Sequence, residues 1–180
     1  MERWFTADTH AWHQNIIAYC DRPWSTAEQM TDDMAVNINA CIPANAILYH
    51  LGDFSWGNKL LVEKFRSMIN CKHIVLVLGN HDKIIRQDKN ARRLFTSVNE
   101  ILEINTSNRH KIVMCHYAMR VWNASFHGAW QLYGHSHGTL PDDPRALSCD
   151  VGVDCWDYKP ISLDTIQETM RRKTCNDEDS

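Results

Sequence analysis

The stretch HIVLVLGNHD, residues 73–82, decides the fold. Its first six residues predict a buried strand, because an apolar run of this length is typical of a strand covered on both faces. A glycine and three polar residues, Gly79-Asn80-His81-Asp82, follow directly. Open α/β sheets place their ligands beyond the carboxyl ends of the strands. We therefore expect a functional site where this strand ends.

The same arrangement recurs along the chain. Further polar residues that can bind metal follow other predicted strands: Asp8 and His10, Asp53, His116, and His135 and His137. In the first half, strands alternate with helices, which predicts βαβ units and a largely parallel sheet; in the second half, closely spaced strands predict a more antiparallel sheet. The expected fold class is α/β.

Two helices carry specific expectations. Ser25 and Glu28 have the spacing of a capping box, with Ser25 as the N-cap of the helix that follows. A further helix is expected over residues 84–95. The length of 180 residues predicts one domain, residues 1–173, followed by an acidic, frayed tail over residues 174–180.

Composition narrows the function classes. With 44% hydrophobic residues, 23% charged residues and a net charge of −3, the chain is an ordinary globular protein without a large basic footprint for nucleic acid. Seven cysteines without a C-x-x-C pair favour a reducing compartment. No apolar run approaches the roughly 20 residues of a membrane span. We expect a cytoplasmic protein that does not bind membranes; nothing in the sequence indicates an oligomeric state.

The polar residues are of types that bind divalent metal. Asp8 and His10 are alternate residues, so in an extended segment they point to one side and can bind one ion; the same holds for His135 and His137. Asp53 has two carboxylate oxygens, which can bridge two cations.

The residues of the motif at 79–82 have different expected roles. Asn80 offers an amide oxygen as a ligand. Its neighbour His81 cannot easily share the same ion and is left free to contact substrate. We expect Asp82 to act with it, orienting the imidazole of His81 and raising its pKa.

Each motif also has an ordinary explanation. A D-x-H group is often part of a solvated loop, and an H-x-H pair is often part of a surface turn. Taken alone, His116 is more often a hydrogen-bonded buried histidine than a metal ligand. The complete set, in one order and always at a strand end, instead predicts two neighbouring divalent ions. Such pairs activate water for attack on phosphate esters.

With these motifs, the chain resembles the calcineurin-like metallophosphoesterase superfamily. The pattern D-x-H, G-D, G-N-H-[DE], H and G-H-x-H is matched in order, and the resemblance extends over residues 4–166. It is strongest to short, cap-less bacterial and phage-type phosphoesterases, in stretches such as Arg22-Pro23 and residues 150–154. The resemblance implies a two-sheet β-sandwich flanked by helices, in four layers α/β/β/α.

The resemblance also implies a set of ligands. One ion would take Asp8, His10 and His137, the other Asn80, His116 and His135, and Asp53 would bridge them. A hydroxide bridging the ions would attack phosphorus, and His81 would stabilise the developing charge or protonate the leaving group. Mixed nitrogen and oxygen ligands suit manganese, iron or zinc, and we expect manganese.

One departure narrows the substrate. Protein Ser/Thr phosphatases and diadenosine tetraphosphatases have the pattern G-D-x-x-D-R-G, whereas this chain continues Gly52-Asp53-Phe54-Ser55-Trp56-Gly57 without the arginine. A dianionic monoester therefore lacks one bidentate partner, which favours a phosphodiesterase for a small or nucleotide-type ester. The alternatives are a phosphomonoesterase, a nuclease on single-stranded ends, and a non-catalytic interaction scaffold of the same fold.

Residues near the motifs are candidates for substrate contacts. Aromatic rings can stack on bases and an arginine can bind a phosphate oxygen. The expected contacts are Trp56, Arg120, Asn123 and His127, with Trp12, His13 and Trp122 as further pocket candidates. The alternative is that the tryptophans fill the core and Arg120 is a solvated surface charge.

Overall fold

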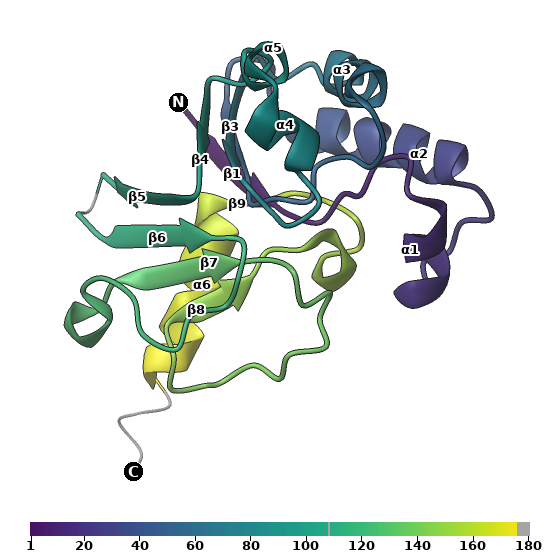
Figure 1. The fold of residues 1–180 in the computed structure, drawn as a ribbon. Coiled ribbons are helices and arrows are strands. Elements are labelled where there is room, and N and C mark those ends of the chain that lie inside the picture. The colour runs from purple at the N-terminus through teal and green to yellow at the C-terminus, as the bar shows by residue number, and fades with distance from the viewer. Residues whose placement is uncertain (108, 176–180) are drawn as a thin grey trace.

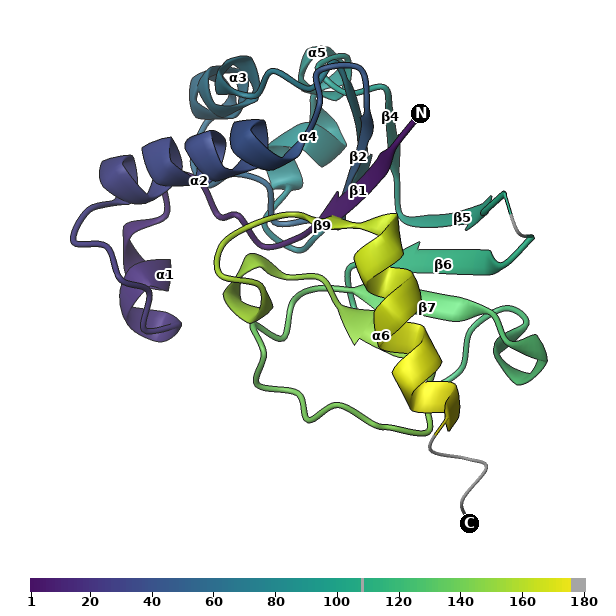
Figure 2. The ribbon, with the colours of Figure 1, turned by 180° about the vertical axis from the view of Figure 1, so that it is seen from behind.

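Two β-sheets lie against each other in the structure, a computed structural model that describes residues 1–107 and 109–175, and helices flank them (Figures 1 and 2). The expected two-sheet sandwich flanked by helices is thereby confirmed. Most of the predicted acidic tail, residues 176–180, lies outside the described residues.

The first sheet is largely parallel, as predicted. Its order is β4-β3-β2-β1-β9, in which β1 to β4 are parallel and β9 runs antiparallel to β1. The strands are β1 (Arg3–Thr6), β2 (Ile47–His50), β3 (His73–Val77), β4 (Ser97–Asn99) and β9 (Ile161–Ser162). Parallel strands end at one edge, so the loops after β1, β2 and β3 meet there.

The second sheet corrects an expectation. Its strands, in the order β5-β6-β7-β8, are β5 (Ile101–Asn105), β6 (Lys111–Cys115), β7 (Trp130–Tyr133) and β8 (Ser148–Asp150). Only β5 and β6 pair antiparallel; β6, β7 and β8 are parallel. The prediction of a more antiparallel sheet was therefore wrong for these strands. Their connections, residues 116–129 and 134–147, are long enough to return to the start of the sheet, which a hairpin turn is not.

The helices differ in two details from the expectations above. They are α1 (Gln14–Tyr19), α2 (Ala27–Cys41), α3 (Lys59–Met68), α4 (Lys83–Gln87), α5 (Lys89–Arg92) and α6 (Leu163–Cys175), with short 3-10 turns η1 (Ser125–His127) and η2 (Val153–Cys155). The N-cap of α2 is Thr26 rather than Ser25. The helix expected over residues 84–95 is divided at Asp88, whose carboxylate caps α5.

The core has two parts, one on each face of the first sheet. Alternate residues of β3 divide between them: Ile74 and Leu76 pack under the helices, whereas Val75 and Val77 face the second sheet. Helix α6, on the side of the second sheet, contributes to the part between the sheets. Because the first sheet is buried on both faces, its strands are held in place, and the loops that follow them start from rigid positions. Among the described residues, no helix is long and apolar enough to cross a membrane.

Candidate metal centre

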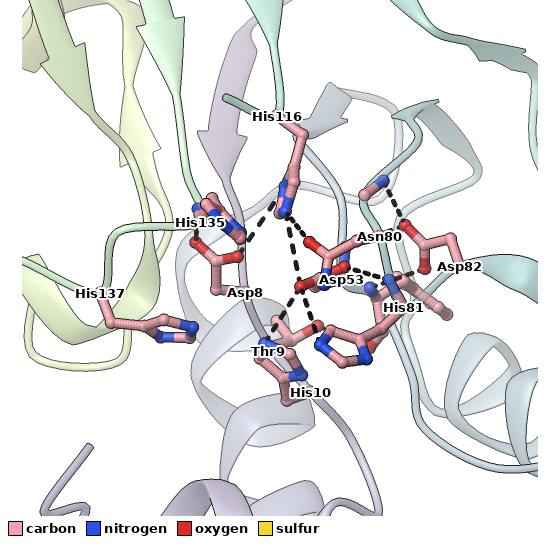
Figure 3. Close-up of polar contacts among 12 residues, drawn as sticks. Asp8, Thr9, His10, Asp53, Asn80, His81, Asp82, His116, His135 and His137 are labelled. Carbon is pink, nitrogen blue, oxygen red and sulfur yellow. Dashed lines mark hydrogen bonds and ion pairs between the residues drawn. The ribbon is translucent and has the colours of Figure 1, made fainter. Parts of the chain in front are cut away.

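The predicted ligands converge from five strand ends onto one place between the two sheets (Figure 3). Asp8 and His10 follow β1, Asp53 follows β2, Asn80 follows β3, His116 follows β6, and His135 and His137 follow β7. Residues up to 129 positions apart in the sequence therefore become neighbours.

The backbone at these positions is left-handed rather than extended. The φ angles are 59° at Asp8, 47° at His10, 53° at Asp53, 68° at His135 and 48° at His137. The expectation that these residues lie in extended segments was therefore wrong. The side chains of Asp8 and His10, and those of His135 and His137, nevertheless converge on the site. Non-glycine residues in this region cost energy, and such strain gathers at functional sites.

Two motif glycines allow the carboxylates to approach the backbone. A Cβ atom at Gly134 would lie 2.6 Å from Oδ2 of Asp8, and one at Gly79 would collide with the carboxylate of Asp53. Any other residue at either position would displace a candidate ligand. This contact explains why both motifs begin with glycine.

The converging side chains form two groups, which we call the Asp8 pocket and the His116 pocket. The Asp8 pocket consists of Asp8, His10 and His137, and the His116 pocket of His116, His135 and Asn80. The three ligand atoms of the Asp8 pocket lie within 4.8 Å of one another, as do those of His116, His135 and Asp53. Each set is close enough to bind one ion.

Asp53 lies between the two pockets. Its Oδ2 atom is 3.4 Å from Nε2 of His10 in one pocket and 3.5 Å from Nε2 of His116 in the other. Burial raises the pKa of Asp53, but the hydrogen bond and charge of His116 outweigh it and hold that pKa below its usual range. The bridging position expected for this carboxylate is thus sterically available.

The chemistry of the Asp8 pocket fits a cation. Oδ1 of Asp8 and Nε2 of His10 are buried and have no hydrogen-bond partner among the described residues. Burial raises the pKa of Asp8 to about 7 and lowers that of His10 to about 2. Buried polar atoms without partners are costly, and a divalent ion would satisfy both. The oxygen and nitrogen donors suit manganese, iron or zinc.

A buried ion pair supports the Asp8 pocket from behind. Nδ1 of His137 lies 2.6 Å from Asp154, and Arg22 donates to both carboxylate oxygens of Asp154 at 2.8 Å. The same guanidinium donates to the backbone oxygens of Asp8 (2.7 Å) and Thr9 (3.2 Å). Burial lowers the pKa of His137, but the bond to Asp154 outweighs it and raises that pKa to about 10. The pair holds His137 with Nε2 directed away from Asp154.

The His116 pocket has less support. Nδ1 of His116 lies 2.7 Å from the backbone oxygen of Leu51, which leaves Nε2 for Asn80, 3.1 Å away. His135 is exposed and Asn80 is half-buried. The backbone N–H of His135 donates to Asp8 at 2.8 Å and so connects the two pockets.

His81 lies beside the pockets rather than within them. Its backbone N–H donates to Oδ1 of Asp53 at 2.8 Å, and its Nε2 is 4.0 Å from Oδ2 of Asp53. One third of the side chain is exposed, and it lines a cavity of about 510 Å³ that also reaches His10, His135 and His137. The ring can thus contact a ligand of the cavity, and its catalytic role stays a prediction.

Asp82 has a different role from the one expected. Its buried carboxylate accepts backbone hydrogen bonds from Asp53 (2.8 Å), Phe54 (3.0 Å) and Gly79 (2.8 Å). The prediction that it orients the imidazole of His81 was therefore wrong, because the carboxylate is committed to the backbone of two loops (Figure 3). Burial raises the pKa of Asp82 to about 6. Asp82 joins the Asp53 loop to the β3 loop.

Of the expected substrate contacts, Trp56 lines the cavity. Its ring lies 4.1 Å from that of His13 and 5.0 Å from that of His81, measured between centroids. His13 lines the cavity as well. Trp12, in contrast, donates its indole N–H to the backbone of Leu61 and packs into the core cluster under the helices.

The other three expected contacts lie elsewhere. Asn123 donates to the carboxylate of Glu103 on β5, Arg120 lines a separate hollow together with Trp122, and His127 lies in η1 before the start of β7. Their assignment to the substrate cavity was wrong. The connection of residues 116–129 turns away from the carboxyl end of β6 and returns to the opposite end of the sheet.

Sequence reasoning also missed functional neighbours. Arg22 and Asp154 belong to stretches that carried the family resemblance, but their pairing spans 132 positions and leaves no local signal. Asn15 and Tyr19 of α1 also line the cavity, and neither is among the expected substrate contacts.

Comparisons with known proteins agree with this arrangement. A family model described as calcineurin-like phosphoesterase matches residues 1–139. Uncharacterized protein MJ1445 of Methanocaldococcus jannaschii is 31% identical over 182 residues, which cover 95% of this chain and 94% of the relative. The crystal structure of AQ665 from Aquifex aeolicus, a protein of unknown function, has a TM-score of 0.73 at 23% identity and covers 93% of this chain and 98% of its own. The last comparison shows a shared fold.

Proposed function

The chain belongs to the calcineurin-like phosphoesterase family and is a metal-dependent phosphoester hydrolase, and from this premise we propose that it cleaves phosphodiesters at a centre of two divalent cations. The observation that carries the proposal is the position of Asp53, whose Oδ2 atom lies 3.4 Å from His10 in one pocket and 3.5 Å from His116 in the other. A carboxylate in that position can serve two ions at once. Manganese is the proposed metal.

Two bound cations would lower the pKa of an attacking water and offset the charge that develops on the phosphate. The residues of the chain supply the rest. As the water oxygen joins phosphorus, the bond from phosphorus to the leaving oxygen breaks, and His81 gives that oxygen a proton. Trp56 and His13 pack beside the ring of His81 and restrict its motion. Asp82 holds the backbone of both ligand loops.

The lining of the cavity supports a diester. Among its described lining residues there is no arginine and no lysine. A dianionic monoester gains most from a bidentate arginine, whereas a monoanionic diester needs less positive charge. The proposed substrate is therefore a small diester of the nucleotide type.

Steady-state turnover of the manganese-loaded protein tests the proposal. We expect a higher kcat/KM for bis(p-nitrophenyl) phosphate than for p-nitrophenyl phosphate, and a higher one for a dinucleotide than for the ends of a long single strand. Preference for the monoester or for the polymer would replace the diester proposal with a phosphomonoesterase or a nuclease. Two bound ions without turnover of any ester would indicate a scaffold.

A further inference from the structure

The cavity beside the two pockets is larger than a phosphate group requires. Its volume of about 510 Å³ falls within the range of sites for small organic ligands. One side is formed by the predicted metal ligands and His81. The other side is formed by α1 and Trp56, and Ser136 and Thr139 also line the cavity. Helix α1 has no role in the chemistry proposed above.

Helix α1 presents a polar and aromatic face to this cavity. Ile16 and Ile17 are buried in the core under the helices, which fixes the rotation of the helix. Asn15 and Tyr19, four residues apart, therefore lie on one face and point outward. Their side chains form no hydrogen bond with any other described residue, so both polar groups are free to bind a ligand.

The aromatic rings here are exposed. Tyr19 is 74% exposed and Trp56 is 41% exposed, although both lie beside a rigid and buried centre. His13 is only 8% exposed, and its Nδ1 atom has no hydrogen-bond partner among the described residues. The ring of His13 covers one face of Trp56, with 4.1 Å between the ring centroids. The ring of Tyr19 is therefore the aromatic surface on which a planar ligand can stack. Exposed aromatic surface next to a reaction centre is typical of a binding site for a planar group.

We propose that α1 forms a nucleoside subsite, in which a base stacks on Tyr19, Asn15 bonds to the edge of that base, and the phosphate faces His81. Bases present a π-face for stacking and polar edges for an amide, and this pairing of ring and amide matches both. The subsite rests on the proposed phosphodiesterase function and specifies its substrate as a nucleoside ester.

Two esters with one leaving group test the subsite. The manganese-loaded protein is assayed with p-nitrophenyl thymidine 5′-phosphate and with methyl p-nitrophenyl phosphate. We expect a higher kcat/KM for the nucleoside ester. Tyr19→Ala should lower that value by about 5- to 150-fold, mostly through KM, since one stacked base contributes this much. It should leave the methyl ester unchanged, and Tyr19→Phe should retain the preference.

A matched variant controls for loss of exposed aromatic surface. Phe126 is 87% exposed in η1 and outside this cavity, so Phe126→Ala should change neither ester. Calorimetric titration with thymidine 5′-monophosphate and with methyl phosphate measures the subsite without turnover, and Tyr19→Ala should weaken only the first.

The outcomes separate the two proposals. Turnover of both esters with equal kcat/KM, or with no effect of Tyr19→Ala, would overturn the subsite and leave the phosphodiesterase intact. Absence of turnover with selective binding of thymidine 5′-monophosphate through Tyr19 would overturn the hydrolytic proposal and support the subsite. If the unmodified protein and Tyr19→Ala bind thymidine 5′-monophosphate and methyl phosphate with equal affinity, the subsite is overturned directly.

Discussion

The Asp8 pocket and the His116 pocket share Asp53 but differ in what surrounds them. In the Asp8 pocket, Asp8 and His10 are buried, and Oδ1 of Asp8 has no hydrogen-bond partner within residues 1–107 and 109–175. Arg22 and Asp154 support this pocket. The His116 pocket has the exposed His135 and, in Asn80, a neutral ligand in place of a carboxylate. A set of ligands that includes a buried carboxylate, held in place by hydrogen bonds, binds a cation more tightly than a neutral and more exposed set. We therefore expect the Asp8 pocket to bind a cation before the His116 pocket does.

The largest effect is expected from removing what the two pockets share. Asp53→Asn replaces the carboxylate between them by a neutral amide, which cannot compensate two adjacent cations. Both ions and all measurable turnover should be lost together. Elemental analysis together with the steady-state rate checks this, and a variant that still holds two tight ions would show that Asp53 does not bridge.

A second variant removes chemistry and leaves both pockets intact. His81→Ala should keep both ions and lower kcat by roughly 100- to 10,000-fold, the usual range for one general acid or charge-stabilising donor. Metal content and kcat are measured on the same sample. Loss of an ion would make His81 a ligand and change the composition of the pockets.

The dependence on the leaving group refines this prediction. Nitrophenolate departs without a proton, so its ester should lose less rate in His81→Ala than an alkyl ester does. An equal loss for both esters would exclude proton donation and leave charge stabilisation as the role of His81.

The third change separates the pockets. Asp154→Asn breaks the ion pair with Arg22 and weakens the hold on His137, so manganese affinity at the Asp8 pocket should fall by about 10- to 100-fold. The His116 pocket should be unaffected. Calorimetry with manganese checks this, and circular dichroism confirms the fold. Glu103→Gln, which neutralises an exposed carboxylate on β5 that pairs with Lys111 away from both pockets, is the control for loss of one carboxylate; an equal loss of affinity in both variants would remove the basis for the comparison.

The last prediction concerns pH. Burial raises the pKa of Asp8 to about 7, and the bond to Asp154 raises that of His137 to about 10. A cation requires the carboxylate and the neutral imidazole, so it must displace these protons. Manganese affinity should therefore rise from pH 6 to pH 8, by at most about tenfold per pH unit for each displaced proton. Titrations in buffers of different ionisation enthalpy count the released protons; an affinity that is independent of pH would contradict the protonated state of the pocket.

The comparison also shows what a sequence can reveal. The strands before Asp8, Asp53 and Asn80 were predictable, because short apolar runs followed by glycine or polar residues leave a local pattern. Gly79 and Gly134 are visible in the sequence, whereas the carboxylates that approach them are seen only in the structure. The prediction of two pockets followed from residue types and their order along the chain.

The supports of the site were not predictable in the same way. Arg22 lies in the segment after β1, and Asp154 lies in η2 after β8. They contact each other only because the fold places the ends of β1 and β8 side by side. Asp82 appeared suited to orient His81 because the two are adjacent in sequence, but its carboxylate binds the backbone of Asp53 and Phe54. Asn123 appeared near the site because it follows His116 by few residues, although its connection runs the other way. Such contacts depend on tertiary geometry alone.

The most direct test of the central claim is a crystal structure with manganese, located by anomalous scattering at low and at saturating metal. We predict one peak among Asp8, His10 and His137 at low metal, and a second peak among Asn80, His116 and His135 at saturation, with Asp53 between them. A single ion at saturation, first occupancy of the His116 pocket, or an ion held instead by Cys20, His137 and Asp154, whose ligand atoms also lie within 4.8 Å of one another, would contradict it.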